Sequence, residues 1–268
     1  MSNDSRHLPP EIKNFWRLFE KVSYKYQYSN VFDDFLIMCI NYFANGIYIE
    51  QRDNALKKYT ADEKKLFNEM FYCMVKSLED IFKIYSWFDF FGSVYETIII
   101  NKGKQSGLGQ FFTPPEVVDL MVRINTIENQ ENKTIYDPAA GSGRMLIASH
   151  VYSPKNFVYA ADVDLICCKM CVLNMFLHGC RGEVVHMDSL SGDFFYAWFI
   201  DIHPILKLPY IGELKKENSI IMQNFDIMAN NARQKTPTPP EPKAETQQQI
   251  NFDVVIEENE NAFFADIF

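Results

Sequence analysis

The stretch Tyr136-Asp137-Pro138-Ala139-Ala140-Gly141-Ser142-Gly143 decides the fold of this 268-residue chain. It follows a short β-branched and aromatic run at residues 134–136, and it opens a helical pattern over residues 143–152. Two glycines two positions apart let the backbone turn sharply and leave the first amide groups of the helix free to bind a ligand. A tight strand-to-helix turn without a ligand would use the same glycines, so the pattern alone leaves both interpretations open.

Two further strand-like runs follow this stretch, at residues 157–160 and 183–186, and a helical pattern over residues 164–178 separates them. An alternation of strands and helices is typical of a parallel sheet whose helices cover both faces. The sequence therefore predicts an α/β fold with a doubly wound, mostly parallel sheet.

The sequence upstream has a helical pattern from residue 9 to about residue 105. Asn30 can cap a helix that Asn45-Gly46 ends, and Thr60 with Glu63 forms a capping-box pair ahead of a wide apolar stripe. Such a stripe could be a platform for a ligand, but it is more typical of a helix packed against protein. We expect a helical N-terminal domain at residues 1–105 and an α/β domain at residues 106–236.

The C-terminal stretch differs from the rest of the chain in composition. Residues 237–242 are rich in proline and residues 247–249 are glutamines, which is typical of a stiff, polar linker. Residues 241–268 carry seven acidic side chains and one lysine, a net charge of −6 out of −9 for the whole chain. We expect residues 237–268 to be a flexible linker and an acidic tail. Its apolar residues leave open that the tail docks on a protein partner.

The composition excludes several classes of protein. With 47% hydrophobic residues, among them 23 Phe, 14 Tyr and 3 Trp, the chain has enough material for a buried core. No run approaches the about 20 apolar residues that a membrane helix needs. The six cysteines lack framework spacing, and Cys168 and Cys171 form a CxxC without a second pair. We therefore expect a cytoplasmic protein with reduced thiols, no metal site and no membrane partner.

The residues around the glycine turn favour one class of ligand. The next strand ends at Asp162, 21 residues beyond Gly141, where nucleotide-binding α/β folds hold ribose hydroxyls. A strand-end aspartate that simply faces water is the alternative. Asp137, at the tip of the first strand, would repel a pyrophosphate on the same loop and would attract a cationic amino group. The sequence therefore favours S-adenosylmethionine (AdoMet), whose methionyl end carries such a group, over a dinucleotide.

A second motif, Gly109-Gln110-Phe111-Phe112-Thr113-Pro114-Pro115-Glu116, precedes the first strand. Thr113 is a suitable N-cap, Pro114 fits the first helical position, and Glu116 would complete a capping box. Together with Asp137–Gly143 and Asp162, this motif resembles the N6-adenine DNA methyltransferases. The likeness is strongest to the modification (M) subunit of type I restriction–modification systems. It covers residues 85–195 and includes the stretch Asp89-Phe90-Phe91-Gly92-Ser93-Val94-Tyr95-Glu96, the pair Asn174-Met175, and Gly179.

The resemblance implies a Rossmann-like AdoMet-dependent methyltransferase fold with a helical N-terminal domain. Asp162 would take the ribose hydroxyls, Val163 would pack on the adenine ring, and Asp188 would bind the adenine amino group. The remaining implied cofactor-binding residues lie in the two motifs and after the third strand: Gly109, Phe111, Phe112, Thr113, Asp137, Pro138, Ala139, Gly141, Ser142, Gly143 and Ser189.

One element of the family is absent from the sequence. The family transfers the methyl group with a loop of the Asp/Asn/Ser-Pro-Pro-Tyr/Phe type after the fourth strand, and no intact copy occurs here. Residues 225–232 and 252–257 resemble strands followed by altered loops. Asn230, in the first of these, is the best remnant of a catalytic residue.

Two main hypotheses follow. The first is a site-specific N6-adenine DNA methyltransferase of the M-subunit type. Since the chain has a net charge of −9, a local basic patch or a separate specificity or partner subunit would supply the attraction to DNA. The second is a non-catalytic, AdoMet-binding pseudo-methyltransferase that regulates a partner or assembles with it. Methylation of a substrate other than DNA is a third interpretation.

Overall fold

The computed structural model describes residues 8–102, 112–125 and 131–235. The chain divides into a unit of residues 1–229 and a second unit of residues 230–268. Among the described residues, the elements before residue 103 are all helical: η2 (Pro10–Ile12), α1 (Lys13–Ser23), α2 (Tyr28–Phe43), α3 (Ile49–Leu56), α4 (Ala61–Ile81) and α5 (Phe90–Lys102). None of these helices, nor any later one in the described ranges, is long and apolar enough to cross a membrane.

Aromatic side chains hold the helices before residue 103 together. The ring centroid of Phe15 lies 5.2 Å from that of Phe35 on α2 and 5.1 Å from that of Phe90 on α5. Most of the apolar stripe on α4 also packs inward: Phe67, Met70, Met74 and Ile81 are fully buried, whereas Val75 and Phe82 are partly exposed. The stripe is therefore part of the core, as its spacing indicated.

Two helix starts in this region test the capping predictions. The Thr60–Glu63 capping box is confirmed: Glu63 N lies 3.3 Å from Thr60 Oγ1, and Thr60 N lies 2.9 Å from Glu63 Oε2. The Asn30 cap is wrong, because α2 begins at Tyr28 after Gln27, whose backbone is extended. Asn30 lies inside the first turn of α2.

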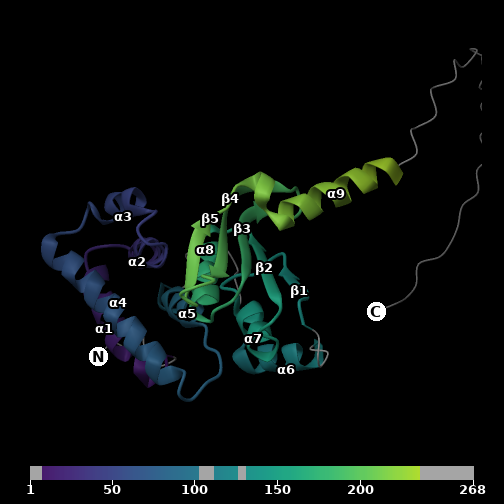
Figure 1. Ribbon diagram of the computed structural model, residues 1–268. Coiled ribbons are helices and arrows are strands. Elements are labelled where there is room, and N and C mark those ends of the chain that lie inside the picture. The colour runs from purple at the N-terminus through teal and green to yellow at the C-terminus, as the bar shows by residue number, and fades with distance from the viewer. Residues whose placement is uncertain (1–7, 103–111, 126–130, 236–268) are drawn as a thin grey trace, which may run out of the picture. The chain divides into compact units, whose positions relative to one another are not determined.

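The second half of the described chain builds a five-stranded sheet with helices around it. Its elements are α6 (Pro115–Asn125), β1 (Thr134–Asp137), α7 (Arg144–Tyr152), β2 (Phe157–Asp162), α8 (Leu165–Leu177), β3 (Gly182–Asp188), β4 (Asp193–Ile202), β5 (Pro209–Glu213), η3 (Lys216–Asn218) and α9 (Ile220–Lys235). Figure 1 shows α1 to α4 gathered on one side of this sheet. The three predicted strands and the two helices between them are confirmed.

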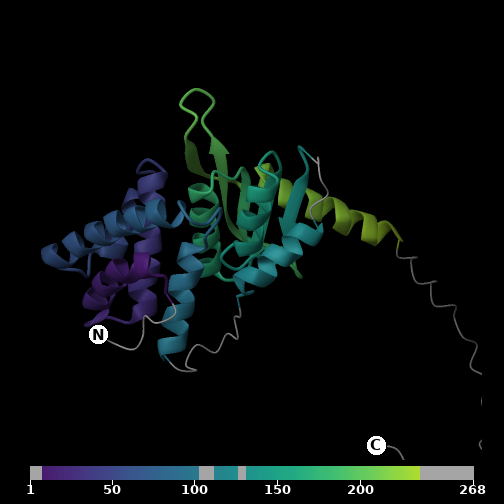
Figure 2. The same cartoon turned by 90° about the horizontal axis from the view of Figure 1, so that it is seen from below.

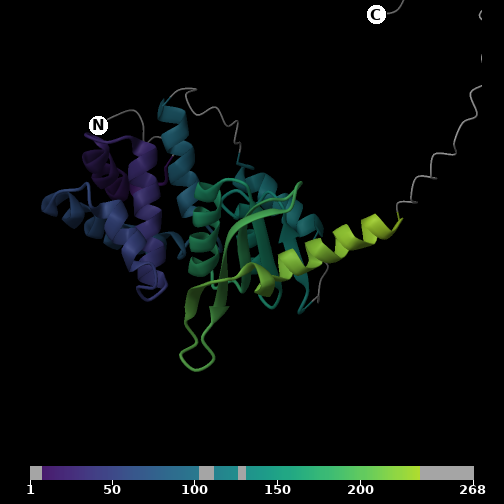
Figure 3. The ribbon, with the colours of Figure 1, turned by 90° about the horizontal axis from the view of Figure 1, so that it is seen from above.

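The sheet is mixed, and its strands follow the chain order β1-β2-β3-β4-β5. β1, β2 and β3 are parallel, whereas β4 and β5 are antiparallel to their neighbours. The predicted α/β class is confirmed and the parallel order holds for β1 to β3, whereas β4 and β5 make the sheet mixed. The cause is a tight reversal after β3, where Gly192 has φ +81° and its N–H donates to the Asp188 carbonyl at 2.8 Å. The turn between β4 and β5 projects from the sheet (Figures 2 and 3).

Both faces of the sheet are covered. On one face, Val158 and Val184 join the core that α8 shares with the N-terminal helices. On the other face, Val185 and Met187 pack against Ile221 and its neighbours at the start of α9. The carboxyl ends of β1, β2 and β3 meet at one edge between these two layers.

Candidate functional site

Three carboxylates stand at the carboxyl ends of adjacent parallel strands. Asp137 ends β1, Asp162 ends β2, and Asp188 ends β3. Because parallel strands present these ends at the same edge, the structure brings the three predicted residues to one place. The loops that follow them are exposed in part: Val163 after β2 is 65% exposed.

The glycine turn is tied to the tip of β2. Gly141 N donates to Asp162 Oδ2 at 2.8 Å, and Ala140 N donates to the Ala161 carbonyl at 3.0 Å. The other oxygen of the same carboxylate, Oδ1, accepts from Asp164 N at 2.8 Å. The Asp162 carboxylate therefore accepts from two backbone amides, one of them in the turn, and it remains at the carboxyl end of β2.

The two glycines of the turn are required for different reasons. Gly141 has φ +55° and Gly143 has φ +80°, both in the left-handed region that favours glycine. A Cβ on Gly143 would lie 2.6 Å from Cys171 Sγ, so this position is set by close packing on α8. A Cβ on Gly141 would lie 3.4 Å from the Phe112 ring, at the mouth of the turn.

The strand-end site is negatively charged. Within residues 8–102, 112–125 and 131–235, no Lys or Arg forms an ion pair with Asp137, Asp162 or Asp188. Burial raises the pKa of the Asp137 carboxyl, and the nearby charge of Asp162 raises it further. In contrast, the amides of Leu190 and Ser191 lower the pKa of Asp188. Such a site attracts a cation or a hydroxyl donor and repels a phosphate.

The segment before α6 closes one side of the turn. Arg144 Nη1 donates to the Thr113 carbonyl at 2.8 Å, and the guanidinium carbon lies 5.4 Å from the centroid of the Phe112 ring. Helix α6 begins at Pro115, one residue later than expected, with the Pro114 carbonyl accepting from Val118 N at 3.0 Å. Of the other residues predicted in this motif, Gly109 and Phe111 lie outside the described residues.

A buried carboxylate behind the turn was not predicted as a site residue. Asp89 is 2% exposed and accepts from Ser142 Oγ at 2.5 Å, Arg144 Nε at 2.8 Å and Asn174 Nδ2 at 2.7 Å. It also accepts from Gly92 N at 2.8 Å and thereby caps α5. The Ser142 hydroxyl therefore faces the interior, and Ser142 as a whole is buried. The signal in the sequence was an aspartate three residues before a glycine, which by itself predicts only a helix cap.

A hydrogen bond joins the ends of β1 and β3. Ser189 Oγ donates to the Pro138 carbonyl at 2.7 Å, while Pro138 and Ala139 are exposed. Leu190, after Ser189, is 97% exposed. The predicted residues of this edge therefore share one accessible surface.

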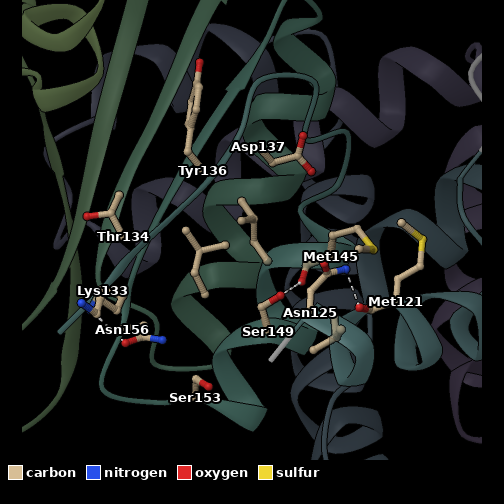
Figure 4. Close-up of a pocket in the computed structure, with 13 residues that line it drawn as sticks. Met121, Asn125, Lys133, Thr134, Tyr136, Asp137, Met145, Ser149, Ser153 and Asn156 are labelled. Carbon is tan, nitrogen blue, oxygen red and sulfur yellow. Dashed lines mark hydrogen bonds between the residues drawn. The ribbon is translucent and has the colours of Figure 1, made fainter. Parts of the chain in front are cut away.

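A cavity of about 290 Å³ lies beside this surface, between β1, α6 and α7. Asp137 is the predicted site residue that lines it, and Figure 4 shows its carboxylate on the side of Met121 and Met145, with Tyr136 pointing elsewhere. No group of three or more His, Cys, Asp or Glu side chains in the described ranges could hold a metal ion.

The family comparison agrees with this geometry. Residues 87–256 match the model of the N-6 DNA Methylase family. The chain belongs to that family. The matched range contains the glycine turn, all three strand-end carboxylates and Asp89.

Relatives of this chain are named as methylase subunits of type I restriction enzymes. The MjaVII methylase subunit of Methanocaldococcus jannaschii is 32% identical over 130 residues, which are 42% of this chain and 22% of that protein. The EcoEI methylase subunit of Escherichia coli is 24% identical over 233 residues, 81% of this chain and 41% of that protein. The chain thus spans less than half the length of these relatives.

A similar solved structure is the methyltransferase subunit of a type I restriction–modification system from Streptococcus thermophilus. It is 15% identical, and the match covers 63% of this chain and 56% of that one with a TM-score of 0.37. The resemblance of the chain to M subunits, inferred from its motifs, is confirmed by the family and by its named relatives.

The segment expected to be a remnant of the family's catalytic loop has a different local structure. Residues 220–235 form helix α9, so the strand expected before Asn230 is wrong. The helix starts there because the Glu183 carboxylate accepts from Ile220 N at 3.0 Å and Ser219 Oγ accepts from Met222 N at 3.3 Å. The second candidate loop, residues 252–257, lies outside the described residues.

Proposed function

We propose that this chain binds AdoMet and serves as an N6-adenine DNA methyltransferase of the type I M-subunit kind, with a Rossmann-like methyltransferase domain at residues 106–236. Helices before residue 106 would form its N-terminal domain. The observation that carries the proposal is the glycine turn held by Asp162 Oδ2 beside two further strand-end carboxylates without cationic partners in the described chain. Membership of the N-6 DNA Methylase family supports the reaction class.

The residues present fit AdoMet. Each oxygen of a carboxylate can accept about two hydrogen bonds, and each Asp162 oxygen already accepts one from a backbone amide. Asp162 can therefore accept from two ribose hydroxyls without losing its hold on the turn. Asp137 would bind the ammonium group, and Asp188, whose lowered pKa keeps it ionised, would accept from the adenine amino group.

The protein's part in the reaction is mainly positioning. AdoMet supplies a methyl group on a sulfonium, and the chain would hold it in line with the adenine amine. Val163 offers an exposed apolar surface for the adenine ring, while Phe112 lies over Gly141 at the other end of the turn. By the family resemblance, Gly109, Phe111 and Thr113 would also contact the cofactor, as would Ala139, which is exposed in the turn.

We propose that a partner subunit supplies most of the attraction to DNA. With a net charge of −9, the chain offers little electrostatic attraction to phosphates. The relatives are named as methylase subunits of restriction enzymes, which favours assembly with a specificity subunit in the cytoplasm. The acidic tail at residues 241–268 is a candidate docking segment for a protein partner.

A second candidate function is a non-catalytic AdoMet-binding subunit. The sequence contains no Asp/Asn/Ser-Pro-Pro-Tyr/Phe loop, and the segment leading to Asn230 is helical. Both observations favour a chain that binds the cofactor without transferring its methyl group.

Calorimetry with AdoMet tests the shared part of both candidates. We expect a dissociation constant in the micromolar range, about −8 kcal/mol, and much weaker binding by Asp162→Ala. Asp201→Ala is the matched control, because this aspartate forms a surface ion pair with Arg181 at the opposite end of the sheet. Absence of heat with the wild-type protein would remove both candidates. Transfer of tritiated methyl groups to adenine-containing DNA would then separate them: label in N6-methyladenine supports the enzyme, and background label supports the binding subunit.

A further inference from the structure

Asp89 connects three elements that are far apart in the sequence. It caps α5 through Gly92 N, binds the glycine turn through Ser142 and the start of α7 through Arg144, and accepts from Asn174 in the last turn of α8. Its carboxylate is 2% exposed and accepts four hydrogen bonds, so its donors satisfy it without water.

Arg144 extends these contacts to the segment before α6. Its guanidinium forms ion pairs with Asp89 at 2.8 Å and with Glu96 at 3.0 Å, both on the α5 side. It also binds the Thr113 carbonyl and lies over the Phe112 ring. These two ion pairs keep the pKa of Arg144 raised although burial lowers it. One cation thus joins α5, the turn and the segment that closes over the turn.

The glycine turn needs support from residues that are not part of it. Its two left-handed glycines cost backbone entropy. On the accessible edge, the Asp137 carboxylate, the Ala161 carbonyl and the Asp162 carboxylate accept from three successive amides of the turn, those of Ala139, Ala140 and Gly141. A turn fixed from the edge side alone would be free to rock toward the interior. Asp89 fixes it from the interior side, through a hydroxyl and a guanidinium on either side of Gly143.

We propose that Asp89 is a positioning residue of the cofactor site, which sets the geometry of the glycine turn through Ser142 and Arg144. This inference rests on the proposed binding of AdoMet to that turn. Asp89 does not touch the ligand in this arrangement. Its removal therefore weakens binding by loosening the turn and not by deleting a contact.

The test compares Asp89→Asn with Glu183→Gln. Glu183 is also a buried carboxylate, 6% exposed, but it caps α9 from the start of β3, at the end of the sheet away from the turn. Both variants lower the melting temperature, because each removes charge from a carboxylate that accepts several hydrogen bonds. Calorimetry with AdoMet is done well below both melting temperatures. We expect Asp89→Asn to weaken AdoMet binding about tenfold or more, and Glu183→Gln to leave the dissociation constant unchanged.

Hydrogen exchange gives a readout that does not depend on the cofactor. In Asp89→Asn the amides of Gly141 and Gly143 should exchange faster, whereas in Glu183→Gln they should not. Unchanged exchange at both amides, or equal loss of AdoMet affinity in the two variants, would overturn the proposal. If the wild-type protein does not bind AdoMet, the proposed function fails, and the exchange rates alone decide whether Asp89 sets the turn.

A milder variant keeps the proposal testable if Asp89→Asn does not fold. Ser142→Ala deletes one hydroxyl and keeps both charges of the Asp89–Arg144 pair. We expect it to weaken AdoMet binding less than Asp89→Asn but by more than about threefold, which corresponds to a lost hydrogen bond. Binding as tight as that of the wild-type protein, with unchanged exchange at Gly141, would refute the role assigned to this contact.

Discussion

Replacing Asp137 by asparagine should move stability and cofactor affinity in opposite directions. The amide has almost the same shape, and its oxygen can still accept from Ala139 N, which lies 3.1 Å from Asp137 Oδ1. The charge is lost. In the fold this charge is unfavourable, because burial and the neighbouring Asp162 raise the pKa of Asp137. A raised pKa means that the folded state binds the proton more tightly than the unfolded chain does, so ionisation near neutral pH costs stability.

The sign of the stability change follows from this pKa shift. Below the ordinary pKa of an aspartate, both proteins carry a neutral group at this position and should be equally stable. As the pH rises through the raised pKa of Asp137, the wild-type protein loses stability that Asp137→Asn keeps. Calorimetric melts of the two proteins without ligand should therefore diverge toward neutral pH, with the variant the more stable.

The affinity should change in the other direction. A hydrogen bond to a charged group contributes about 1.5–3 kcal/mol, and each 1.4 kcal/mol is about tenfold in affinity. Titration calorimetry at neutral pH should thus show AdoMet binding about 10- to 150-fold weaker in Asp137→Asn. Asp201→Asn, at the opposite end of the sheet, should bind like the wild-type protein. An affinity within about twofold of the wild type would refute the assignment of Asp137 to the cationic end of the ligand.

Four other substitutions test the fold. Gly143→Ala should cost about 2–4 kcal/mol in urea unfolding, because φ is +80° and the new Cβ would lie 2.6 Å from Cys171 Sγ, while Gly46→Ala, with φ +81° and nothing within 4 Å, should cost about 1 kcal/mol. Thr60→Ala removes a capping box and should cost about 1 kcal/mol; an unchanged urea midpoint would contradict this. Burial lowers the pKa of His178 to about 4, so the wild-type protein should lose up to about 3 kcal/mol between about pH 6.5 and pH 4. His178→Gln should lack that loss, and parallel pH profiles of the two proteins would exclude it.

The sequence predicted the parts of the fold whose signals are local. β1, β2 and β3 are short apolar runs bounded by turn residues, and the capping box at Thr60 needs only four residues to be recognised. β4 was missed for a physical reason. Its residues 194–199 are almost all aromatic, and they contribute to the cores on both faces of the sheet. A strand buried on both faces loses its alternation, so its pattern does not distinguish it from a buried helix.

The candidate site shows the same division between local and distant signals. Asp137 and Asp162 could be predicted because a strand followed by a glycine turn places them without any knowledge of the tertiary structure. Asp89 could not, since its partners Ser142 and Arg144 lie 53 and 55 residues away. Ser142 was assigned to the ligand because the family resemblance implies cofactor contacts along the whole glycine turn. Only the packing of α5 against the turn shows that its hydroxyl faces inward.

The hydrogen-bond partners of a buried carboxylate indicate whether it joins elements of the fold or is available to a ligand. Its residue type and its position in the sequence do not. Asp89 and Glu183 are buried, and protein donors bind their oxygens, so both join elements of the fold. Asp137 is also partly buried, but within the described chain it accepts one backbone hydrogen bond, from Ala139 N, and forms no ion pair with a Lys or Arg. A buried charge that the fold leaves unneutralised is unfavourable until something binds it. Retaining such a charge next to Asp162 makes physical sense if the compensating cation arrives with a ligand. The stability of Asp137→Asn without ligand therefore distinguishes the two roles. A variant more stable than the wild-type protein indicates a binding residue, and a less stable one indicates a structural residue.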